Sequence, residues 1–295
     1  MKLGLGTAQF GLDYGVSNRG GMTPQNEIAS ILAMAAANGI EYLDTAPAYG
    51  RSEARLGAAL QGRPAFRVVT KTCPLDGDTI RPPQVAASRT TFLRSLEDLR
   101  LEKVYGLLVH HARDVTRPGG ELLLGMMQDL ARQGLVEKLG VSVYDGEQID
   151  AVLEIFTPQL VQCPLNVFDQ RLLASGHLEK LHGLGVEIHL RSIFLQGLLL
   201  MEYAAIPACF AAYRPKMEEF FRFVAQHQWT RLQGALYFAL SQTNADAVVL
   251  GVTSAAELAE IVGFTNTPAP ASAEFARFAI NDPCFVDPSQ WRLAG

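Results

Sequence analysis

Short apolar runs alternate with longer amphipathic stretches along nearly the whole chain. Several apolar runs are continuous rather than alternating, as in VVLG at residues 248–251, which is typical of strands buried on both faces. The stretches between them repeat apolar residues at helical spacing. The pattern therefore predicts strand–helix units in which parallel strands are joined by crossover helices.

Eight such units follow one another. The predicted strands are Leu3–Thr7, Ile40–Asp44, Phe66–Lys71, Val104–His110, Lys138–Ser142, Leu160–Cys163, Val186–Arg191 and Ala247–Gly251. The predicted helices are Pro24–Asn38, one from near Ser52, Pro82–Leu99, Glu121–Gln133, Gly146–Ile155, Arg171–Leu181, a pair between Lys216 and Ser241, Ser254–Val262 and Ser272–Ile280. Gly39 and Gly134 follow two of these helices, at the position where glycine is favoured.

The fold class that we predict is α/β, a (β/α)8 TIM barrel with a parallel eight-stranded sheet. Eight units in 295 residues suit a closed barrel, which takes about 250 residues. An open doubly wound sheet is the alternative that the same alternation allows. No low-complexity linker divides the chain, so we expect residues 1–295 to form one domain.

Composition narrows the functional class. The net charge of −5 does not favour a nucleic-acid or anionic-membrane partner, because both call for a basic surface. The four cysteines are scattered and form no metal-binding motif. The amino terminus lacks the apolar stretch of a signal peptide, and no run of about 18 apolar residues occurs. We therefore expect a cytoplasmic protein without a metal site.

The candidate catalytic and binding residues lie at the carboxyl ends of the predicted strands, because active sites of such barrels form there. The residues at these ends are Thr7, Asp44, Lys71, His110, Ser142, Gln162, Arg191 and Gly251. Several of them are polar or charged and directly follow an apolar run.

Asp44, Lys71 and His110 end three consecutive strands, so their side chains are expected to converge. Tyr49 lies five residues after Asp44 and can fold over the same place. A nearby ammonium stabilises a phenolate and lowers the pKa of the phenol, and a carboxylate keeps that ammonium charged. Each residue alone is more often a loop or surface residue. Together they predict a tyrosine that donates a proton to a carbonyl oxygen, which a histidine holds in place.

These residues stand in motifs that resemble the aldo-keto reductase family. LDTAPAYGRSEARLG at residues 43–57 is similar to the family signature around its aspartate and tyrosine, and VVTKT and LLVHHARD are similar to the segments with its lysine and histidine. The resemblance extends from Leu3 to about Val262. It implies a (β/α)8 fold, NADPH or NADH as cofactor, a small-molecule carbonyl substrate and reversible carbonyl reduction. It also implies Tyr49 as proton donor and favours His110 over His111 as the substrate-orienting histidine.

The resemblance implies a cofactor site at the later strand ends. Ser142 and Gln162 match residues that hold the nicotinamide carboxamide. Arg191 replaces an aromatic residue that stacks on the nicotinamide in many members, and a guanidinium can stack on a planar ring as well. The further candidates are Thr7, Ser192 and the segment Leu195–Leu198 with Gly197, of which Ser192 matches a pyrophosphate contact.

The segment after the eighth strand departs from the family. Many members that prefer NADPH bind its 2′-phosphate there with a lysine and an arginine, whereas GVTSAAELAE at residues 251–260 has no basic residue. Glu257 stands near the arginine position, although Gly251, Thr253, Ser254 and the backbone N–H groups of a helix start can still bind a phosphate. We expect NADH to be accepted at least as well as NADPH.

The substrate and the direction of reaction stay open. The loop after the first strand is polar and contains Tyr14, Asn18 and Arg19, which together with Arg191 favours a polar, sugar-like carbonyl. An NAD-dependent aldose or alcohol dehydrogenase is the first alternative. A non-catalytic, cofactor-sensing barrel is the second. No motif indicates the oligomeric state.

Overall fold

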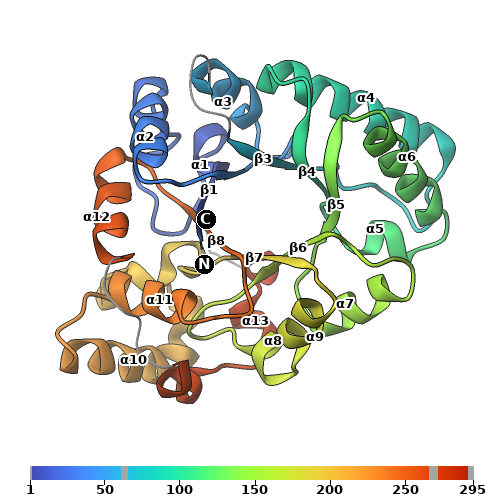
Figure 1. The fold of residues 1–295 in the computed structure, drawn as a ribbon. Helices are drawn as coiled ribbons and strands as arrows, with labels where there is room; N and C mark the ends of the chain where they lie inside the picture. The colour runs from blue at the N-terminus through green and yellow to red at the C-terminus, as the bar shows by residue number, and fades with distance from the viewer. Residues whose placement is uncertain (1, 61–65, 266–271, 292–295) are drawn as a thin grey trace.

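A ring of eight parallel strands forms the centre of the protein in a computed structural model, which describes residues 2–60, 66–265 and 272–291 (Figure 1). Each strand pairs with its neighbours in sequence, and β1 pairs with β8 to close the barrel. The strands are β1 (Lys2–Gly6), β2 (Tyr42–Asp44), β3 (Arg67–Lys71), β4 (Val104–Val109), β5 (Val136–Ser142), β6 (Leu160–Pro164), β7 (Glu187–Arg191) and β8 (Ala247–Gly251). The predicted (β/α)8 barrel is confirmed, and the open-sheet alternative is wrong.

Helices surround the barrel and bury its outer face (Figure 1). The longer ones are α2 (Gln25–Ala37), α3 (Ser52–Leu60), α4 (Pro82–Leu99), α6 (Gly120–Arg132), α7 (Gly146–Leu153), α10 (Arg214–Gln226), α11 (Arg231–Leu240) and α12 (Ala255–Thr265). Shorter ones are α1 (Ala8–Gly11), α5 (Arg113–Thr116), α8 (Arg171–Ala174), α9 (His177–Gly183) and α13 (Pro283–Val286). The 3-10 turns are η1 (Leu195–Leu200), η2 (Tyr203–Ala205), η3 (Ala208–Tyr213), η4 (Ser272–Phe278) and η5 (Pro288–Gln290). No helix among the described residues has the length and apolar character needed to cross a membrane.

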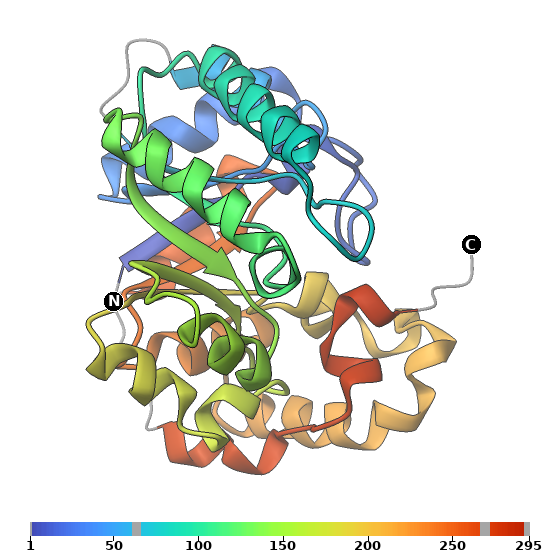
Figure 2. The ribbon, with the colours of Figure 1, turned by 90° about the vertical axis from the view of Figure 1, so that its right-hand side faces the viewer.

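Two predicted helices differ from the structure. The helix predicted over Arg171–Leu181 is divided into α8 and α9, because Gly176 between them adopts a left-handed conformation with φ of 72°. The last predicted helix, near Ser272–Ile280, is present as the 3-10 helix η4 and not as an α-helix. Aromatic packing holds the chain that follows η4, since the Phe285 ring lies 5.7 Å from that of Phe168. Figure 2 shows this tail on the side of the barrel where the strands end.

Strand alternation decides which side chains enter the barrel. In the register of β6 with β7, Gln162 pairs with His189 and Leu160 pairs with Glu187. Glu187 and His189 are two residues apart on β7, so their side chains lie on the same side of the strand, the side that faces the barrel interior. By the same alternation Arg191 follows Glu187 and His189 into the interior, at the carboxyl end. The register thus separates a polar layer at the base of the barrel from the residues at its opposite end.

The base layer is a hydrogen-bonded cluster around Glu187. Its carboxylate accepts hydrogen bonds from the Tyr105 hydroxyl at 2.6 Å, from His189 Nε2 at 2.7 Å and from the Lys138 ammonium. Burial alone would raise the pKa of Glu187, but these three donors outweigh it and hold the pKa well below its ordinary value. The carboxylate is therefore more stable in the folded protein than in the unfolded chain.

We expect Glu187→Gln to lower the free energy of unfolding by about 2–3 kcal/mol, because hydrogen bonds to a charged, buried acceptor are lost. Because folding lowers the pKa of Glu187, its contribution is present above the ordinary carboxyl pKa of about 4 and is lost as the pH falls towards the folded value. Urea unfolding between pH 3 and 7 measures both effects. The control is Glu137→Gln, which breaks an exposed pair with Lys103 worth at most about 1 kcal/mol. An equal loss in both variants would contradict the prediction.

Candidate active site

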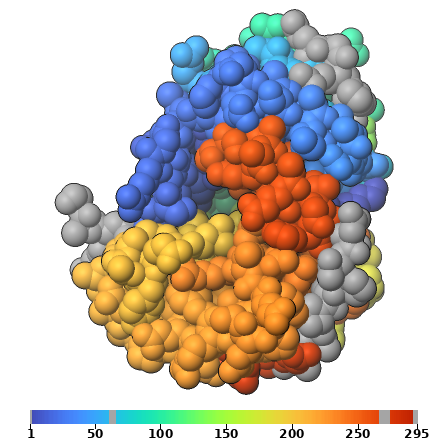
Figure 3. Space-filling view, turned by 90° about the vertical axis from the view of Figure 1, so that its left-hand side faces the viewer, coloured from blue at the N-terminus to red at the C-terminus, as the bar shows by residue number. Residues whose placement is uncertain are grey.

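A cavity of about 710 Å³ opens at the carboxyl ends of the strands. Its walls include the loop after β1, the segment after β7 and the start of α12, which meet on the face shown in Figure 3. Asp44, Tyr49, Lys71 and His110 all line it. The four residues predicted to converge are therefore placed in one cavity: Asp44 and Lys71 end β2 and β3, His110 directly follows β4, which ends at Val109, and Tyr49 lies in the loop after β2.

An ion pair lies at the floor of this cavity. Lys71 Nζ donates to Asp44 Oδ1 at 2.6 Å and to the Thr45 carbonyl oxygen at 2.9 Å, and the lysine is only 2% exposed. Lys71 Nζ also lies 5.0 Å from the centroid of the Tyr49 ring. The His110 ring is nearly perpendicular to the Tyr49 ring, at 6.0 Å between centroids. The ammonium, the phenol and the imidazole thus form one contiguous group.

Close backbone packing positions the loop that carries Tyr49. Gly11 approaches this loop so closely that a Cβ atom would lie 1.9 Å from the Tyr49 carbonyl oxygen, so only glycine fits there. The Ser52 hydroxyl donates to the Thr7 carbonyl oxygen at 2.8 Å, and the Thr7 hydroxyl donates to the Asp44 carbonyl oxygen at 2.9 Å. The helix predicted from near Ser52 is α3, and Ser52 is its first residue. Thr7 lines the cavity, yet its hydroxyl holds the loop in place.

The pKa of Tyr49 differs from the expectation based on sequence. Burial and the Asp44 carboxylate raise the pKa of this phenol well above its ordinary value, while Arg191 opposes the shift. Lys71 was expected to lower this pKa, but burial and the Asp44 carboxylate have the larger effect. Tyr49 is consequently protonated at neutral pH, which is the form that a proton donor requires.

His110 is held in its neutral form. Burial is the largest cause, and the charges of Lys71, His111 and Arg191 add to it, so the pKa of His110 falls to about 3. The buried Nδ1 atom of His110 has no hydrogen-bond partner among the described residues. His111 is exposed. The geometry therefore favours His110 as the residue that meets a bound molecule, in line with the choice made from sequence.

The floor of the cavity can accept a carboxamide. Ser142 and Gln162 both line it. Gln162 Nε2 donates to Asp44 Oδ1 at 2.8 Å, which leaves the buried Gln162 Oε1 atom without a donor among the described residues. A buried amide oxygen without a partner is costly, and a ligand N–H group would satisfy it. These two residues fit the nicotinamide carboxamide that the family resemblance implies.

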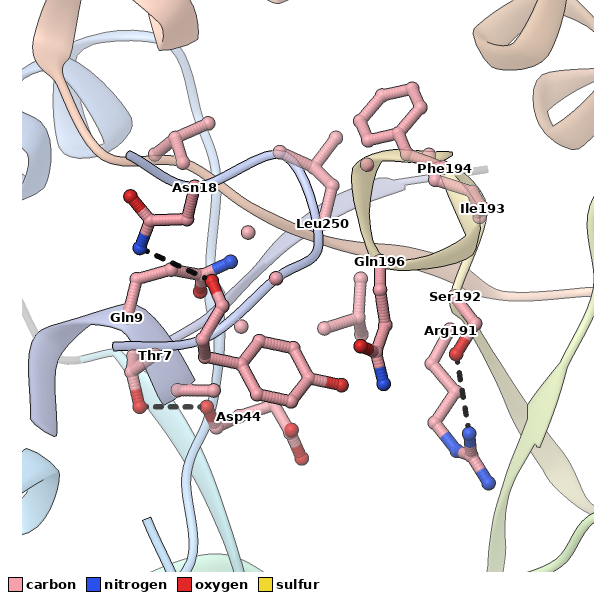
Figure 4. A pocket seen from close by; sticks show the side chains of 18 of the residues that line it. Thr7, Gln9, Asn18, Asp44, Arg191, Ser192, Ile193, Phe194, Gln196 and Leu250 are labelled. Atoms are coloured by element: carbon pink, nitrogen blue, oxygen red, sulfur yellow. Dashed lines mark hydrogen bonds between the residues drawn. The ribbon is translucent and has the colours of Figure 1, made fainter. Parts of the chain in front are cut away.

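The segment after β7 borders the cavity with a strained backbone. Ser192, Leu195 and Gln196 adopt positive φ angles of 59°, 48° and 54°. Arg191, Ser192 and Gln196 line the cavity (Figure 4). Gly197 lines it as well, whereas the Leu195 side chain is buried in the core. Val16 N donates to the Gln196 carbonyl oxygen at 2.9 Å, so this segment contacts the loop after β1. Gln196 lies within the segment Leu195–Leu198 that was expected from sequence, but its contact with the loop after β1 was not predicted, because no local pattern indicates a contact between these distant loops.

The start of α12 is occupied by the protein's own carboxylates. Glu257 accepts hydrogen bonds from Thr253 N at 2.7 Å and from Thr253 Oγ1 at 2.9 Å. Glu27, from α2, accepts from Ala255 N at 2.6 Å. Ser254 accepts from Glu257 N and does not belong to the cavity lining, which does include Gly251, Thr253, Glu257 and Glu260. The N–H groups of Thr253 and Ala255, which a phosphate would need as donors, are therefore already bonded to the carboxylates of Glu257 and Glu27.

Comparisons with known proteins give the family and the fold. The sequence profile of the aldo/keto reductase family matches residues 2–279. The structure is similar to a glycerol dehydrogenase from Gluconobacter oxydans (TM-score 0.70, 22% identity, 93% of this chain and 89% of that chain covered). It is also similar to the holo form of an aldo-keto reductase from Bacillus halodurans (TM-score 0.75, 17% identity, 98% and 95% covered). At these identities the likeness supports the fold alone. The search of curated proteins found no significant match.

Proposed function

This chain belongs to the aldo/keto reductase family, and from that premise we propose that it reduces an aldehyde or ketone to an alcohol with NADH or NADPH. The family supports an oxidoreductase that uses a nicotinamide cofactor and acts on small carbonyl compounds. The observation that carries the finer proposal is the meeting of Asp44, Tyr49, Lys71 and His110 in one cavity. The unpaired Gln162 Oε1 atom beside them supports the cofactor site.

Each residue of this group has a defined task in the proposed reaction. Hydride comes from the reduced nicotinamide when the cofactor is bound. Tyr49 donates its hydroxyl proton to the carbonyl oxygen as that oxygen gains negative charge. Lys71 stabilises the phenolate that remains, and Asp44 keeps Lys71 charged and in place. Neutral His110 donates a hydrogen bond to the carbonyl oxygen and orients the substrate.

The direct test is the oxidation of NADH or NADPH by the purified protein in the presence of small aldehydes, followed by absorbance. Turnover that depends on the aldehyde supports the proposal. Cofactor binding without turnover in either direction would favour the cofactor-sensing barrel instead. The opposite direction, oxidation of an alcohol with NAD, uses the same four residues, and the carboxylate at Glu257 is the observation in its favour.

We expect NADH to bind at least as tightly as NADPH, because the 2′-phosphate would meet Glu257 and find the N–H groups of Thr253 and Ala255 already bonded. Quenching of Trp229 and Trp291 fluorescence measures both affinities. Glu257→Gln keeps the hydrogen-bonding shape and removes the charge, so NADPH affinity should rise about three- to tenfold. Glu260→Gln, one turn further along α12, should have a smaller effect. NADPH binding tenfold tighter than NADH in the wild type would refute this preference.

A further inference from the structure

Arg191 brings a positive charge into the cavity without an acidic partner. Its Nη2 atom donates to the Val143 carbonyl oxygen at 3.1 Å. Its Nη1 atom donates to Ser192 Oγ at 3.3 Å (Figure 4). Its Cζ atom lies 4.4 Å from the centroid of the Tyr144 ring. Within residues 2–60, 66–265 and 272–291, no carboxylate forms an ion pair with Arg191. These contacts fix the orientation of the guanidinium but leave its charge uncompensated.

Three other partly or fully buried arginines have partners of different kinds. Arg117 pairs with Asp114 at 2.7 Å, and Arg171 pairs with Asp169 at 2.8 Å. Arg55 has no acidic partner, but each of its three guanidinium nitrogens donates a hydrogen bond, to Gln25 or to backbone carbonyl oxygens. A guanidinium has five N–H donors, and the described contacts of Arg191 use only two. Arg191 therefore retains both charge and donors for a bound molecule.

Two of the three carboxylates that line the cavity are already engaged, and the third, Glu260, lies beside Glu257 on α12. Asp44 accepts from Lys71 and Gln162, and both oxygens of Glu257 accept from Thr253. The Lys71–Asp44 pair is neutral as a whole, and the low pKa of His110 keeps the imidazole uncharged. The positive charge of Arg191 is thus the excess charge at the catalytic end of the cavity.

We propose that the substrate carries an oxyanion, a carboxylate or a phosphate, and that Arg191 binds it while Tyr49 and His110 hold the carbonyl group. This inference rests on the proposed reductase function. The planar guanidinium presents parallel N–H donors that match the two oxygens of such a group. Contacts with Tyr144, Val143 and Ser192 hold that plane in advance, which reduces the entropy lost on binding. Arg191 then determines specificity for anionic carbonyl compounds over neutral ones of the same shape.

Matched substrates separate charge from shape. Succinic semialdehyde and its neutral methyl ester form one pair, and glyceraldehyde 3-phosphate and glyceraldehyde form the other, so the two pairs distinguish a carboxylate from a phosphate. We expect the wild type to favour the anionic member of at least one pair about tenfold or more in kcat/KM. Arg191→Gln should remove this preference, mainly through a higher KM for the anionic compound. Arg191→Lys should retain part of it.

Three outcomes would overturn the proposal. The first is an anionic-to-neutral ratio near one in the wild type. The second is an Arg191→Gln variant that keeps the anionic-to-neutral ratio of the wild type but binds NADH more weakly. This result would assign Arg191 to the cofactor. The third is loss of the preference in Arg19→Gln, a matched charge removal on the β1 loop in the same cavity, rather than in Arg191→Gln.

A binding measurement keeps the inference separate from the proposed function. If the wild type reduces none of the four compounds, the reductase proposal fails, but calorimetry with 4-hydroxybutanoate and its neutral amide still tests Arg191. The acid should bind at least about tenfold more tightly to the wild type than to Arg191→Gln, and the amide should bind equally to both. Equal binding of the acid to the two proteins would overturn the role of Arg191.

Discussion

The Tyr49→Phe variant should bind NADH as the wild type does and lose about 10²–10⁴-fold in kcat. The phenol is held protonated by burial and by Asp44, so its hydroxyl is the proton donor available beside Lys71. Phenylalanine keeps the ring and its edge contact with His110 but removes that proton. General acid catalysis of this kind contributes about two to four orders of magnitude. Steady-state kinetics together with fluorescence titration of NADH measure the two quantities separately.

Tyr42→Phe is the matched control for Tyr49→Phe. Tyr42 begins β2 and lies at the base of the barrel, where its hydroxyl accepts a hydrogen bond from Arg67 at 3.2 Å. Loss of this hydroxyl should change stability slightly and leave kcat within about threefold of the wild type. A Tyr49→Phe enzyme with normal kcat would show that another group, or water, supplies the proton. Loss of NADH binding in that variant would instead indicate a structural role for the hydroxyl.

Local sequence patterns were sufficient for the barrel and for the convergence of its strand ends. Several strands contain a short apolar run and end at a polar residue or glycine, as in β3, which ends at Lys71, and β8, which ends at Gly251. Successive parallel strands bring these ends together, so Asp44, Lys71 and His110 could be placed in one cavity from their order alone. The α8–α9 break at Gly176 was missed because an isolated glycine is tolerated within many helical patterns.

Contacts between distant segments could not be predicted. Glu27 on α2 bonds Ala255 at α12, 228 residues later, and no local pattern links the two. The direction of the pKa shift at Tyr49 was also inaccessible, because it depends on how far burial outweighs the neighbouring charges. Similarly, the sequence identified Arg191 as unusual, but only the structure shows the Tyr144 ring beside it and no acid paired with it among the described residues.

The Lys71→Met variant should lose both activity and stability. Removal of the ammonium leaves the Asp44 carboxylate, 6% exposed, without its cation, and breaking a buried ion pair in this way costs about 3–5 kcal/mol. Turnover should fall by at least about 10²-fold, because the phenolate of Tyr49 loses the charge that stabilises it. Urea unfolding and steady-state kinetics measure the two losses.

The double variant Lys71→Met with Asp44→Asn separates these two roles. Asparagine removes the unpaired carboxylate and can still accept the hydrogen bond from Gln162, so most of the lost stability should return. Activity should not return, because no cation remains to stabilise the Tyr49 phenolate. Recovery of both properties would mean that Lys71 acts only by neutralising Asp44. Recovery of neither would mean that methionine disturbs the packing of the cavity floor, and a smaller Lys71→Ala change would then separate packing from charge.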